Sequence, residues 1–520
     1  DLNLISEEEE ERLIFTFNHT EHWYQREHSL RQELQERAEE FPDRAALIWR
    51  GQRTTYRELL QEARELGERL AALCPGGEKN IALLLEPGAD LFLWMCAVTW
   101  SGNAWVLLDR ELPAGRIRLM LEESEAALCI SEEAQGESLL PCRIMSKKEV
   151  LETSPCPEEE LPVPGADWRA YLVYTSGSTG TPKAVETVQR SLVNLAENMR
   201  EIYPKGAVLS LCSVGFDAFI LESMCALLCG RTIVVLPGED RNRPEAIAEA
   251  ILRYDAGFLA LTPSRLQAYL QNPLFGKAAG KLECIVCGGE TLSGELLSAV
   301  RDVSGANLYN QYGPSEATVA VSHARITGEE RFTIGKPFWN CRIYILDDKL
   351  RPLAPGCAGE LYIGGDCLAR GYFRDEEKTK ERFISDPYVP GERLYRTGDM
   401  GEWTPDGRIV FLGRKDRQMK LLGHRIEPGE VEERLLAYRG VRQVAVTALG
   451  NQLAAYYTAE KEIDPEELLN YGADYLPRYM LPVYARQLER IPSTPGGKVD
   501  YGALPAPETG AESDQPLDDT

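Results

Sequence analysis

Two hydrophobic patterns alternate along the chain as far as about Gly335. Segments 29–40 and 56–73 repeat apolar residues at the spacing of an amphipathic helix, the first of them after a Ser cap. Short apolar runs of strand length lie between such helices: 45–49, 81–85, 105–108, 127–130, 171–174, 232–236, 257–261 and 282–287. Because strands and helices alternate at this spacing, the sequence predicts an α/β fold with largely parallel sheets.

The most apolar stretch is 91–108, which has the length of a membrane span. The polar triplet Ser101-Gly102-Asn103 interrupts it, and Asp109-Arg110 follows directly. A buried helix followed by a strand therefore explains this stretch better than a helix that crosses a membrane.

The pattern changes beyond about Gly335. Strand-length runs at 343–346, 359–364 and 409–412 are separated by turns rich in Pro and Gly, which predicts a small antiparallel sheet or a β-barrel-like subdomain. A charged run, GRKDRQMK, begins at Gly413 and marks a candidate boundary before a small α+β domain of about 90 residues. Segment 505–520 has the composition of a disordered linker.

The charge of the chain excludes some partners. Its 520 residues include 57 Lys and Arg against 82 Asp and Glu, a net charge of −25. This charge would repel nucleic acid or an anionic membrane surface, so we expect neither as a partner. A local basic pocket for a small anion, such as a nucleotide, is still compatible with it. Segment 1–12 is acidic and lacks the basic and apolar regions of a secretory signal, so we expect a cytoplasmic location.

The chain has 13 scattered cysteines. Their odd number and irregular spacing are typical of reduced cytoplasmic thiols rather than a disulfide framework. Cys284 and Cys287 form a CxxC pair, but they lie inside an apolar run and no second ligand pair is near in the sequence. We therefore favour a buried strand over a metal site here.

The segment with the clearest chemistry is YLVYTSGSTGTPK, which runs from Tyr171 to Lys183. A predicted strand leads into a loop whose backbone N–H and hydroxyl groups can surround an anion: Ser176, Gly177, Ser178, Thr179 and Gly180. Lys183 adds a positive charge. The loop is not a Walker A motif, because that pattern needs Gly directly before the Lys and Pro182 stands there.

This loop is one of nine segments that resemble, in order along the chain, the motifs of adenylate-forming enzymes, and specifically of the adenylation domains of nonribosomal peptide synthetases. The segments are TTYREL (54–59), YTSGSTGTPK (174–183), FDAFILE (216–222), NQYGPSE (310–316), GELYIGGDCLARGY (359–372), YRTGDM (395–400), GRKDRQMKLLGHRIEPGEVE (413–432), LPRYMLP (476–482) and GGKVD (496–500). The chain departs from the family's usual residues at Gln189, Pro428 and Gly496. None of these departures removes a charged group that the chemistry requires.

The resemblance implies a two-step reaction. An amino acid and ATP, with Mg2+, would give aminoacyl-AMP and pyrophosphate, and the aminoacyl group would pass to the phosphopantetheine thiol of a carrier domain. The nucleophile of the first step is the substrate carboxylate, which is already ionised at neutral pH and needs no general base. Catalysis then depends on positioning and on neutralising charge at the α-phosphate.

The resemblance also implies the domain organisation. Residues 1–45 resemble the junction that follows a condensation domain, 46–414 form the large adenylation core, 415–504 form the small mobile domain, and 505–520 lead towards a carrier domain. We therefore expect the amino acid substrate, a carrier domain and an upstream condensation domain of the same polypeptide as partners. In this arrangement the chain would be one piece of an assembly line for a peptide natural product.

Residues of the nucleotide site follow from the same motifs. Lys498 matches the lysine that contacts both the substrate carboxylate and the phosphate, and Arg414 matches the arginine near the ribose and phosphates; with Lys183 they form the implied catalytic set. Glu316 matches the magnesium-associated glutamate, since a hard cation takes oxygen ligands. The positions implied to bind ATP are Thr175, Ser176, Gly177, Ser178, Thr179, Gly180, Lys183, Gly289, Glu290, Asn310, Gln311, Tyr312, Gly313, Ser315, Asp399, Phe411, Arg414 and Lys498.

Asp217 matches the aspartate that pairs with the α-ammonium of the substrate. A buried carboxylate is costly without such a partner, and activators of aryl or fatty acids generally lack this residue. The other positions implied to line the substrate pocket are Ala218, Leu221, Ala260, Ile285, Cys287, Gln311, Val319, Ala320 and Lys498. This apolar lining favours a large hydrophobic or aromatic amino acid, although Gln311 could bind a polar tip such as that of tyrosine.

Asp416 matches the hinge about which the small domain turns between the two steps, which would bring the strand around Leu421–Gly423 to the thiol channel. Two alternative functions were weighed. A free-standing acyl- or aryl-CoA ligase is disfavoured by Asp217, and a degenerate interaction module is disfavoured by the charged residues that remain: Lys183, Glu316, Asp399, Arg414 and Lys498.

Overall fold

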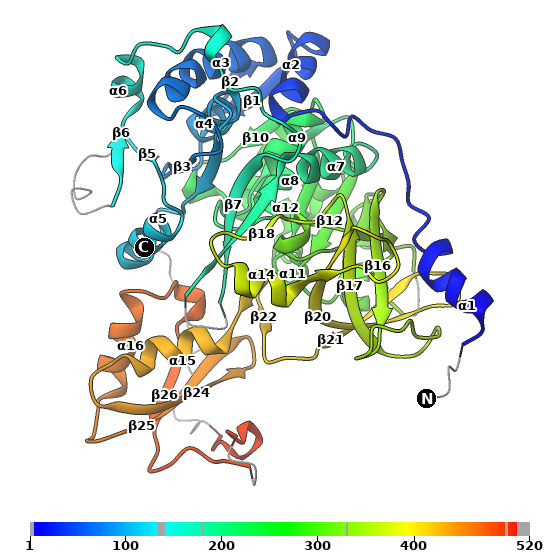
Figure 1. The fold of residues 1–520 in the computed structure, drawn as a ribbon, viewed down its shortest axis with the longest axis vertical. Coiled ribbons are helices and arrows are strands. Elements are labelled where there is room, and N and C mark those ends of the chain that lie inside the picture. Colours follow the sequence, from blue (N-terminus) through cyan, green and yellow to red (C-terminus); the bar gives the residue numbers. More distant parts are fainter. Residues whose placement is uncertain (1–4, 133–140, 178–180, 329–330, 495–497, 507–520) are drawn as a thin grey trace. The chain divides into compact units, whose positions relative to one another are not determined.

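Parallel strands dominate the two largest sheets of the fold (Figure 1). The structure, a computed structural model, describes residues 5–132, 141–177, 181–328, 331–494 and 498–506. The chain divides into a large unit, Asp1–Thr175 with Pro182–Arg425, and a small unit, Ser176–Thr181 with Ile426–Thr520. The predicted linker 505–520 lies mostly outside the described residues.

The larger sheet has nine strands in the order β15-β14-β13-β12-β11-β9-β10-β1-β2. The six strands from β13 to β1 are parallel, and the edge strands β2, β14 and β15 pair antiparallel. The bounds are β1 Ala45–Trp49, β2 Gln52–Thr55, β9 Ala207–Ser210, β10 Ile233–Val235, β11 Ala256–Leu261, β12 Cys284–Gly288, β13 Asn307–Tyr312, β14 Ser322–Arg325 and β15 Lys336–Pro337.

The second sheet has seven strands in the order β18-β8-β7-β4-β3-β5-β6. Its strands are parallel from β7 to β6, and β8 and β18 are antiparallel. The bounds are β3 Asn80–Leu83, β4 Ala104–Leu107, β5 Leu128–Ile130, β6 Arg143–Met145, β7 Arg169–Thr175, β8 Lys183–Val188 and β18 Gly371–Tyr372. The predicted α/β class with largely parallel sheets is thus confirmed.

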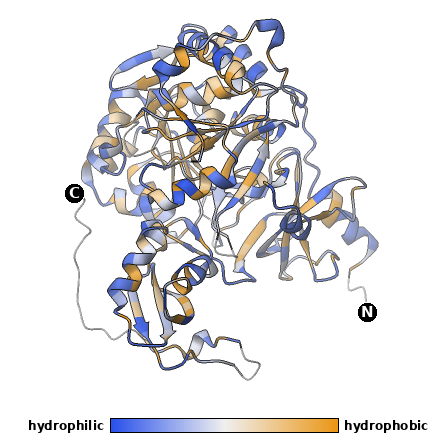
Figure 2. Cartoon of the chain, turned by 60° about the vertical axis from the view of Figure 1, so that its left-hand side comes forward, coloured by the Kyte–Doolittle hydropathy of each residue, from blue (hydrophilic) through white to orange (hydrophobic). Residues whose placement is uncertain are grey.

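Helices cover these sheets with one apolar side each. One hydrophobic cluster lies between the nine-stranded sheet and α10 Pro244–Tyr254, α11 Pro263–Leu270, α12 Pro273–Ala279 and α13 Gly294–Val303. The main core contains the other face of that sheet and α2 Leu30–Glu40, α3 Tyr56–Leu73, α4 Ala89–Trp100, α7 Gln189–Met199, α8 Phe219–Glu222 and α9 Met224–Leu228. The helices accordingly carry both hydrophobic and hydrophilic colours in Figure 2.

The apolar stretch 91–108 forms a buried helix and a strand, as predicted. All residues of α4 from Leu91 to Trp100 are buried, and β4 follows after the Ser101-Gly102-Asn103 turn. No helix in the described part of the chain is both long and apolar enough to span a membrane.

The CxxC pair lies in β12, as predicted. Residues of β12 face the two clusters alternately, so Cys284 lies in the main core and Cys287 in the cluster under α10–α13. Because the two side chains point to opposite faces of the sheet, they cannot bind one metal ion together. All 13 cysteines are free thiols.

A third sheet, of five strands, follows the two large ones. Strands β16 Cys341–Leu346, β17 Gly359–Gly365, β20 Arg393–Trp403 and β19 Phe383–Ser385 pair in that order, and β21 Ile409–Arg414 pairs with β20. Every pairing is antiparallel, as the sequence predicts. Helix α14 Glu376–Arg382 lies between β18 and β19 in the chain.

The small unit contains α15 Pro428–Leu436, α16 Pro465–Ala473 and a three-stranded sheet of β24 Val441–Leu449, β25 Gln452–Ala459 and β26 Tyr484–Gln487. The hairpin of β22 Met419–Leu421 and β23 His424–Ile426 crosses the boundary between the units. The contacts therefore place the boundary after Arg425, later than the position at Gly413–Lys415 that the charged run suggests.

The N-terminal segment, which the sequence suggests is a linker, folds onto the large unit. It forms α1 Glu7–Glu11, the π-helical turn Arg12–Thr16 and α2, and it buries Leu13, Tyr24, Leu30 and Leu34 in the main core. The described part of this segment, residues 5–45, thus packs into the large unit.

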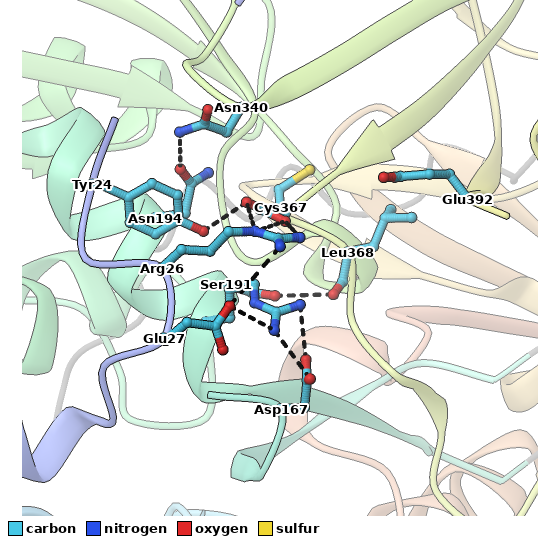
Figure 3. Close-up of polar contacts among 12 residues, drawn as sticks. Tyr24, Arg26, Glu27, Asp167, Ser191, Asn194, Asn340, Cys367, Leu368 and Glu392 are labelled. Atoms are coloured by element: carbon cyan, nitrogen blue, oxygen red, sulfur yellow. Dashed lines mark hydrogen bonds and ion pairs between the residues drawn. The ribbon is translucent and has the colours of Figure 1, made fainter. Parts of the chain in front are cut away.

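One carboxylate holds this segment in place. Asp366 accepts a hydrogen bond of 2.7 Å from the Tyr24 hydroxyl and an ion pair of 2.8 Å from Arg26. Figure 3 shows Tyr24 and Arg26 directed at the loop that carries Cys367. Asp366 and Arg26 also line a cavity of about 370 Å³, whose lining includes four arginines: Arg26, Arg190, Arg370 and Arg393.

We expect Asp366→Asn to reduce the free energy of unfolding of the large unit by about 2 kcal/mol at neutral pH, because a partly buried charge pair and its Tyr24 bond are lost. Burial alone would raise the pKa of Asp366, but Arg26 and Tyr24 lower it overall. The stabilisation is therefore fully present above the unfolded pKa of about 4 and is lost as the pH falls through the lower folded pKa.

Urea unfolding of wild type and Asp366→Asn at pH 7 and at pH 3 measures this difference. The matched control is Asp43→Asn, which removes an exposed pair with Arg57 and should change stability by less than about 0.5 kcal/mol. An Asp366→Asn effect as small as that of the control would contradict the prediction.

Candidate active site

The centre of the site is the chain that leaves β13. Tyr312 ends that strand, and the short 3₁₀ turn Ser315–Ala317 follows it. Thr318 and Val319 then adopt positive φ angles of 56° and 69°. β-branched residues rarely occupy this left-handed region, so the turn is strained. It is held by the Thr318 hydroxyl, which donates to the Cys367 carbonyl at 2.8 Å.

A hydrogen-bonded group suited to a nucleoside lies on one side of this turn. The Tyr312 hydroxyl donates to Asp399 Oδ2 at 2.5 Å, and Arg414 pairs with Asp399 Oδ1 at 2.7 Å. Asp399 on β20 and Arg414 on β21 are direct cross-strand partners. Gly398 has φ +76°, and a Cβ at this position would lie 2.7 Å from the Arg414 guanidinium. A larger residue at position 398 would therefore displace Arg414 from Asp399.

The aromatic partner of Tyr312 is Phe411, whose ring centroid lies 5.9 Å away. The predicted hinge residue Asp416 accepts two bonds of 2.7 Å from Arg414. Asp416 thereby connects the nucleoside group to the segment that leads out of the large unit. Burial and Asp399 together raise the pKa of Tyr312 well above its usual value, so its hydroxyl keeps its proton at any physiological pH.

The predicted metal residue, Glu316, is completely buried at 0% exposure. Its Oε1 accepts from the Tyr372 hydroxyl at 2.8 Å, and its Oε2 pairs with Arg425 at 2.9 Å. Burial alone would raise the pKa of Glu316, but the Arg425 guanidinium lowers it to about 2. The carboxylate is therefore ionised at all working pH values. Such an oxygen donor suits Mg2+ together with nucleotide phosphates.

Asp217 lies in the turn before α8, on the other side of the Ser315 turn. The Ser315 hydroxyl donates to Asp217 Oδ2, while the carboxylate of the next residue, Glu316, accepts from Tyr372, so the two carboxylates are bound at adjacent residues of one turn. Desolvation and the nearby Glu316 raise the pKa of Asp217, although the Ser315 bond opposes them. Among the described residues Asp217 has no cationic partner at ion-pair distance.

The phosphate loop is only partly described. Thr175 ends β7 opposite Lys183 on β8, and its Oγ1 is buried without a hydrogen-bond partner among the described residues. An anion that accepts from this hydroxyl would fit there. Lys183 is buried, with its Nζ 5.8 Å from the centre of the Tyr372 ring. Ser178, Thr179 and Gly180 lie outside the described residues.

The beginning of the loop belongs by its contacts to the small unit. The Gly177 N–H donates to Glu430 Oε2 of α15 at 3.0 Å, and both Ser176 and Gly177 are buried. The Gly177 N–H, which the sequence predicts to face an anion, is thus bound to the carboxylate of Glu430 in this structure.

Four further predicted nucleotide residues lie in β13 or directly after β12 and β13. Glu290 accepts from the Ser264 backbone and hydroxyl at 2.9 Å each. Asn310 is buried and donates to the Thr333 carbonyl at 2.8 Å, and Gly313 is half-buried. Gly289 has φ +81° and lies against the backbone of Gly423, with 3.7 Å between its Cβ position and the nearest atom.

Gly423 marks a second close approach. A Cβ at Gly423 would lie 2.4 Å from the Thr262 side chain, so only glycine fits between Thr262 and Glu290. The segment Leu421–Gly423 therefore borders the site inside the large unit.

The strand register divides the predicted pocket residues of β11 and β12 between two faces. On β11 and β12, Ala260 and Val286 face the main core beside α8, whereas Ile285 and Cys287 face the cluster under α10–α13. Because alternate strand residues point to opposite faces, Ala260 does not share a face with Ile285 and Cys287, whose place in the pocket stays a prediction. Val286 and Gly288, one position along, stand on the face of Ala260.

The other predicted pocket residues surround that face. Leu221 on α8, Val319 and Ala320 are buried in the main core with Ala260, and Ala218 is half-buried next to Asp217. Gln311 is buried and donates to the Met199 sulfur at 3.2 Å. Apart from Asp217 and the predicted Lys498, no charged side chain belongs to this set.

Lys498 lies in the small unit. It is exposed, in a turn closed by the Ser493–Val499 bridge and by the Thr494 N–H, which donates to the Lys498 carbonyl at 2.7 Å. Its role in the site stays a prediction.

Sequence reasoning missed Arg425 and Tyr372 as partners of Glu316. Both residues lie inside motifs that were identified, GHRIE and ARGY. The only signal available was physical: a buried glutamate requires a buried cation. Nothing in the sequence said which of the nearby basic residues supplies it.

The parallel sheets, the nucleoside group and the phosphate loop together define a nucleotide-binding α/β enzyme. The family of AMP-binding enzymes matches residues 34–373, well over half of the chain. The chain belongs to this family, and the adenylate-forming resemblance seen in the sequence is confirmed.

The curated relatives include large peptide synthetases. The chain is 34% identical to bacitracin synthase 3 of Bacillus licheniformis over 98% of its own length and 8% of that protein. It is 36% identical to a dimodular nonribosomal peptide synthase of Bacillus subtilis, over 98% of the chain and 22% of that protein. The chain thus spans less than a quarter of the length of these relatives.

Solved structures have the same fold. An artificially fused adenylation–PCP di-domain, NpsA-ThdA from Klebsiella oxytoca, has a TM-score of 0.80 at 25% identity and covers 89% of this chain and 94% of that one. A four-domain nonribosomal peptide synthetase bound to AMP and glycine has a TM-score of 0.70 at 30% identity, covering 95% of this chain and 37% of that one. The chain is therefore similar to adenylation domains of nonribosomal peptide synthetases.

Proposed function

We propose that the chain activates an amino acid as its adenylate. The observation that carries this proposal is Asp217: a carboxylate next to buried apolar residues of the main core and bound to Ser315, without a cation at ion-pair distance among its described neighbours. An α-ammonium group supplies that cation. The relative bound to AMP and glycine supports an amino acid rather than another carboxylic acid.

In the first step a carboxylate oxygen of the amino acid attacks the α-phosphate of ATP, and the bond to the β-phosphate breaks to release pyrophosphate. Asp217 holds the ammonium, and Tyr312, Asp399 and Arg414 hold the nucleoside. Lys183 and Lys498 face the phosphates with positive charge, which stabilises the transition state. When Mg2+ is bound, it neutralises charge on the phosphates, with Glu316 as its protein ligand.

The second step proposed is transfer to a carrier thiol. The sulfur forms a bond to the acyl carbon, AMP leaves, and the thiol proton is lost to solvent. The NpsA-ThdA relative joins an adenylation domain to a PCP domain, which supports such a partner. The tight approach of Gly423 to Thr262 supports a role for segment Leu421–Gly423 at the site in this step. An upstream condensation domain stays part of the proposal.

The side chain of the amino acid is proposed to be large and hydrophobic or aromatic. The lining that we propose on the face of Ala260 is apolar and partly small: Ala218, Leu221, Ala260, Val286, Gly288, Gln311, Val319 and Ala320. Burying an apolar side chain there contributes about 25 cal/mol per Å². A charged side chain would enter this lining without a partner, at a cost of several kcal/mol.

We expect ATP–pyrophosphate exchange across all proteinogenic amino acids to give activity, with Phe, Tyr, Trp, Leu or Met above Asp, Glu, Lys and Arg. Asp217→Asn should raise the KM for the preferred amino acid by about 100-fold or more, because a buried charge pair with the ammonium is lost. The KM for ATP should stay within about threefold, because the nucleoside group is untouched.

A charged amino acid ranking first would contradict the pocket assignment. Activity with a simple carboxylic acid and coenzyme A, and none with amino acids, would instead favour the CoA-ligase alternative. No exchange with any substrate would favour the interaction module.

Lys498→Ala should abolish adenylation but leave transfer from supplied aminoacyl-AMP. Removing one charged transition-state contact costs about 3–4 kcal/mol, a rate loss of several hundredfold. Single-turnover assays separate the two half-reactions, with a carrier domain that bears a free phosphopantetheine thiol as the acceptor for the transfer step. The matched control is Lys461→Ala, an exposed lysine of the same unit, which should retain both activities. Equal loss of both steps in Lys498→Ala would argue against its assignment.

The register of β12 predicts which substitutions change selectivity. Val286→Phe should lower kcat/KM for aromatic amino acids relative to alanine by about 10-fold to 100-fold, because the larger side chain fills the pocket. Cys287→Ala, one residue along but on the opposite face, should lower the Tm and leave the amino acid ranking unchanged. A selectivity change confined to Cys287→Ala would show that the pocket uses the other face.

A further inference from the structure

We propose that Arg425 is a positioning residue that competes with the divalent cation for the carboxylate of Glu316, so that the two bind it in turn. This inference rests on the proposed function, since the cation belongs to the adenylation step. It assigns to Arg425 a role for which the sequence motifs give no residue.

The first argument is that each carboxylate oxygen of Glu316 already has a hydrogen-bond partner. Glu316 is completely buried; the Tyr372 hydroxyl binds Oε1 at 2.8 Å and the Arg425 guanidinium binds Oε2 at 2.9 Å. Mg2+ needs a carboxylate oxygen at about 2.1 Å in octahedral geometry. A cation on the same carboxylate would face the positive charge of Arg425 in a buried, weakly screened site, where repulsion is strong.

The second argument concerns the other charges at this point. Besides Arg425, the groups that face Glu316 are the Tyr372 hydroxyl, which donates to it at 2.8 Å, the Tyr395 phenol and the nearby carboxylate of Asp217. Lys183 Nζ lies 5.8 Å from the centre of the Tyr372 ring. Arg425 is therefore the positive group in direct contact with the carboxylate, and the group that an incoming cation must displace.

The third argument is the place of Arg425 in the chain. It is the last residue of the large unit, and β23 continues directly into Ile426, the first residue of the second segment of the small unit. Arg425 is thus one of the three residues of the large unit that are joined covalently to the small unit, together with Thr175 and Pro182, so a movement of β23 would act on it directly. The ion pair can respond to the step of the reaction, which a pair between two core elements could not.

Together these points give the pair a function beyond stability. When the cation and pyrophosphate are absent, Arg425 holds the carboxylate of Glu316 in place through the ion pair of 2.9 Å. When Arg425 withdraws, the same carboxylate is free for the cation. The alternative is a permanent structural ion pair, in which Arg425 stays bound to Glu316 and the cation binds to other groups.

The test is Mn2+ binding to the full chain, without nucleotide, followed by electron paramagnetic resonance. Arg425→Gln keeps a hydrogen-bond donor to Glu316 but removes the charge. We expect the apparent Kd for Mn2+ to fall by about tenfold or more, within the usual range for two ligands that exclude each other. The gained site should vanish in the double variant Arg425→Gln/Glu316→Gln.

Matched controls separate charge from structure. Arg425→Lys keeps a positive charge beside Glu316 and should stay within about threefold of wild type. Arg331→Met removes an exposed arginine that pairs with Glu402, far along the chain, and should not change Mn2+ binding. Should Arg425→Gln fail to fold, Arg425→Met, which replaces the guanidinium by an apolar side chain, carries the same expectation.

Unchanged Mn2+ affinity in the neutral variants would overturn the proposal, and so would a gained site that survives in the double variant. These outcomes are distinct from a failure of the proposed function. An enzyme active in pyrophosphate exchange but unchanged in Mn2+ binding refutes only the competition. A chain inactive in exchange refutes the function and leaves the Mn2+ comparison to be judged by itself.

Discussion

Burying the carboxylate of Glu316 constrains much of the large unit. An ionised carboxylate at 0% exposure costs several kcal/mol unless it is paired and hydrogen-bonded. Its two partners come from different places: Tyr372 from β18 of the seven-stranded sheet and Arg425 from the β22–β23 hairpin. Glu316 itself follows β13 of the nine-stranded sheet. Because the charge must be satisfied, three separate sheets have to meet at this residue, and the site lies where they meet.

Residues of the same turn contact different parts of the candidate site. Tyr312 donates to Asp399, Ser315 donates to Asp217, and Val319 lies in the apolar main core. Eight residues of chain can serve three purposes only if the backbone turns sharply. The left-handed angles at Thr318 and Val319 produce that turn, at a cost of order 1–3 kcal/mol each. The hydrogen bond from Thr318 to Cys367 stabilises it.

The sequence predicted the class and order of elements well, but it could not show which side chains of strand β12 share a face with Ala260. Segments such as 56–73 have a helical period, and strand runs such as 257–261 stand between turns, so their type follows from pattern alone. Strand β12 reads CIVCG, apolar on both faces, and a strand buried on both sides has no alternation to identify the face that meets the pocket. That face emerges only from pairing with β11. The Glu316–Arg425 pair joins residues 109 positions apart, which no local pattern indicates.

The charges of the site are balanced in pairs, and the exception points to the substrate. Arg414 pairs with Asp399 and Asp416, and Arg425 pairs with Glu316. Asp217 makes no such pair among the described residues, and burial raises its pKa. A ligand ammonium would lower that pKa again, so binding and ionisation of Asp217 favour each other, and affinity for an amino acid increases as the pH rises through the raised pKa. A neutral or purely anionic ligand would gain nothing from this arrangement, so the proposed function assigns the unpaired carboxylate to the ammonium group of an amino acid.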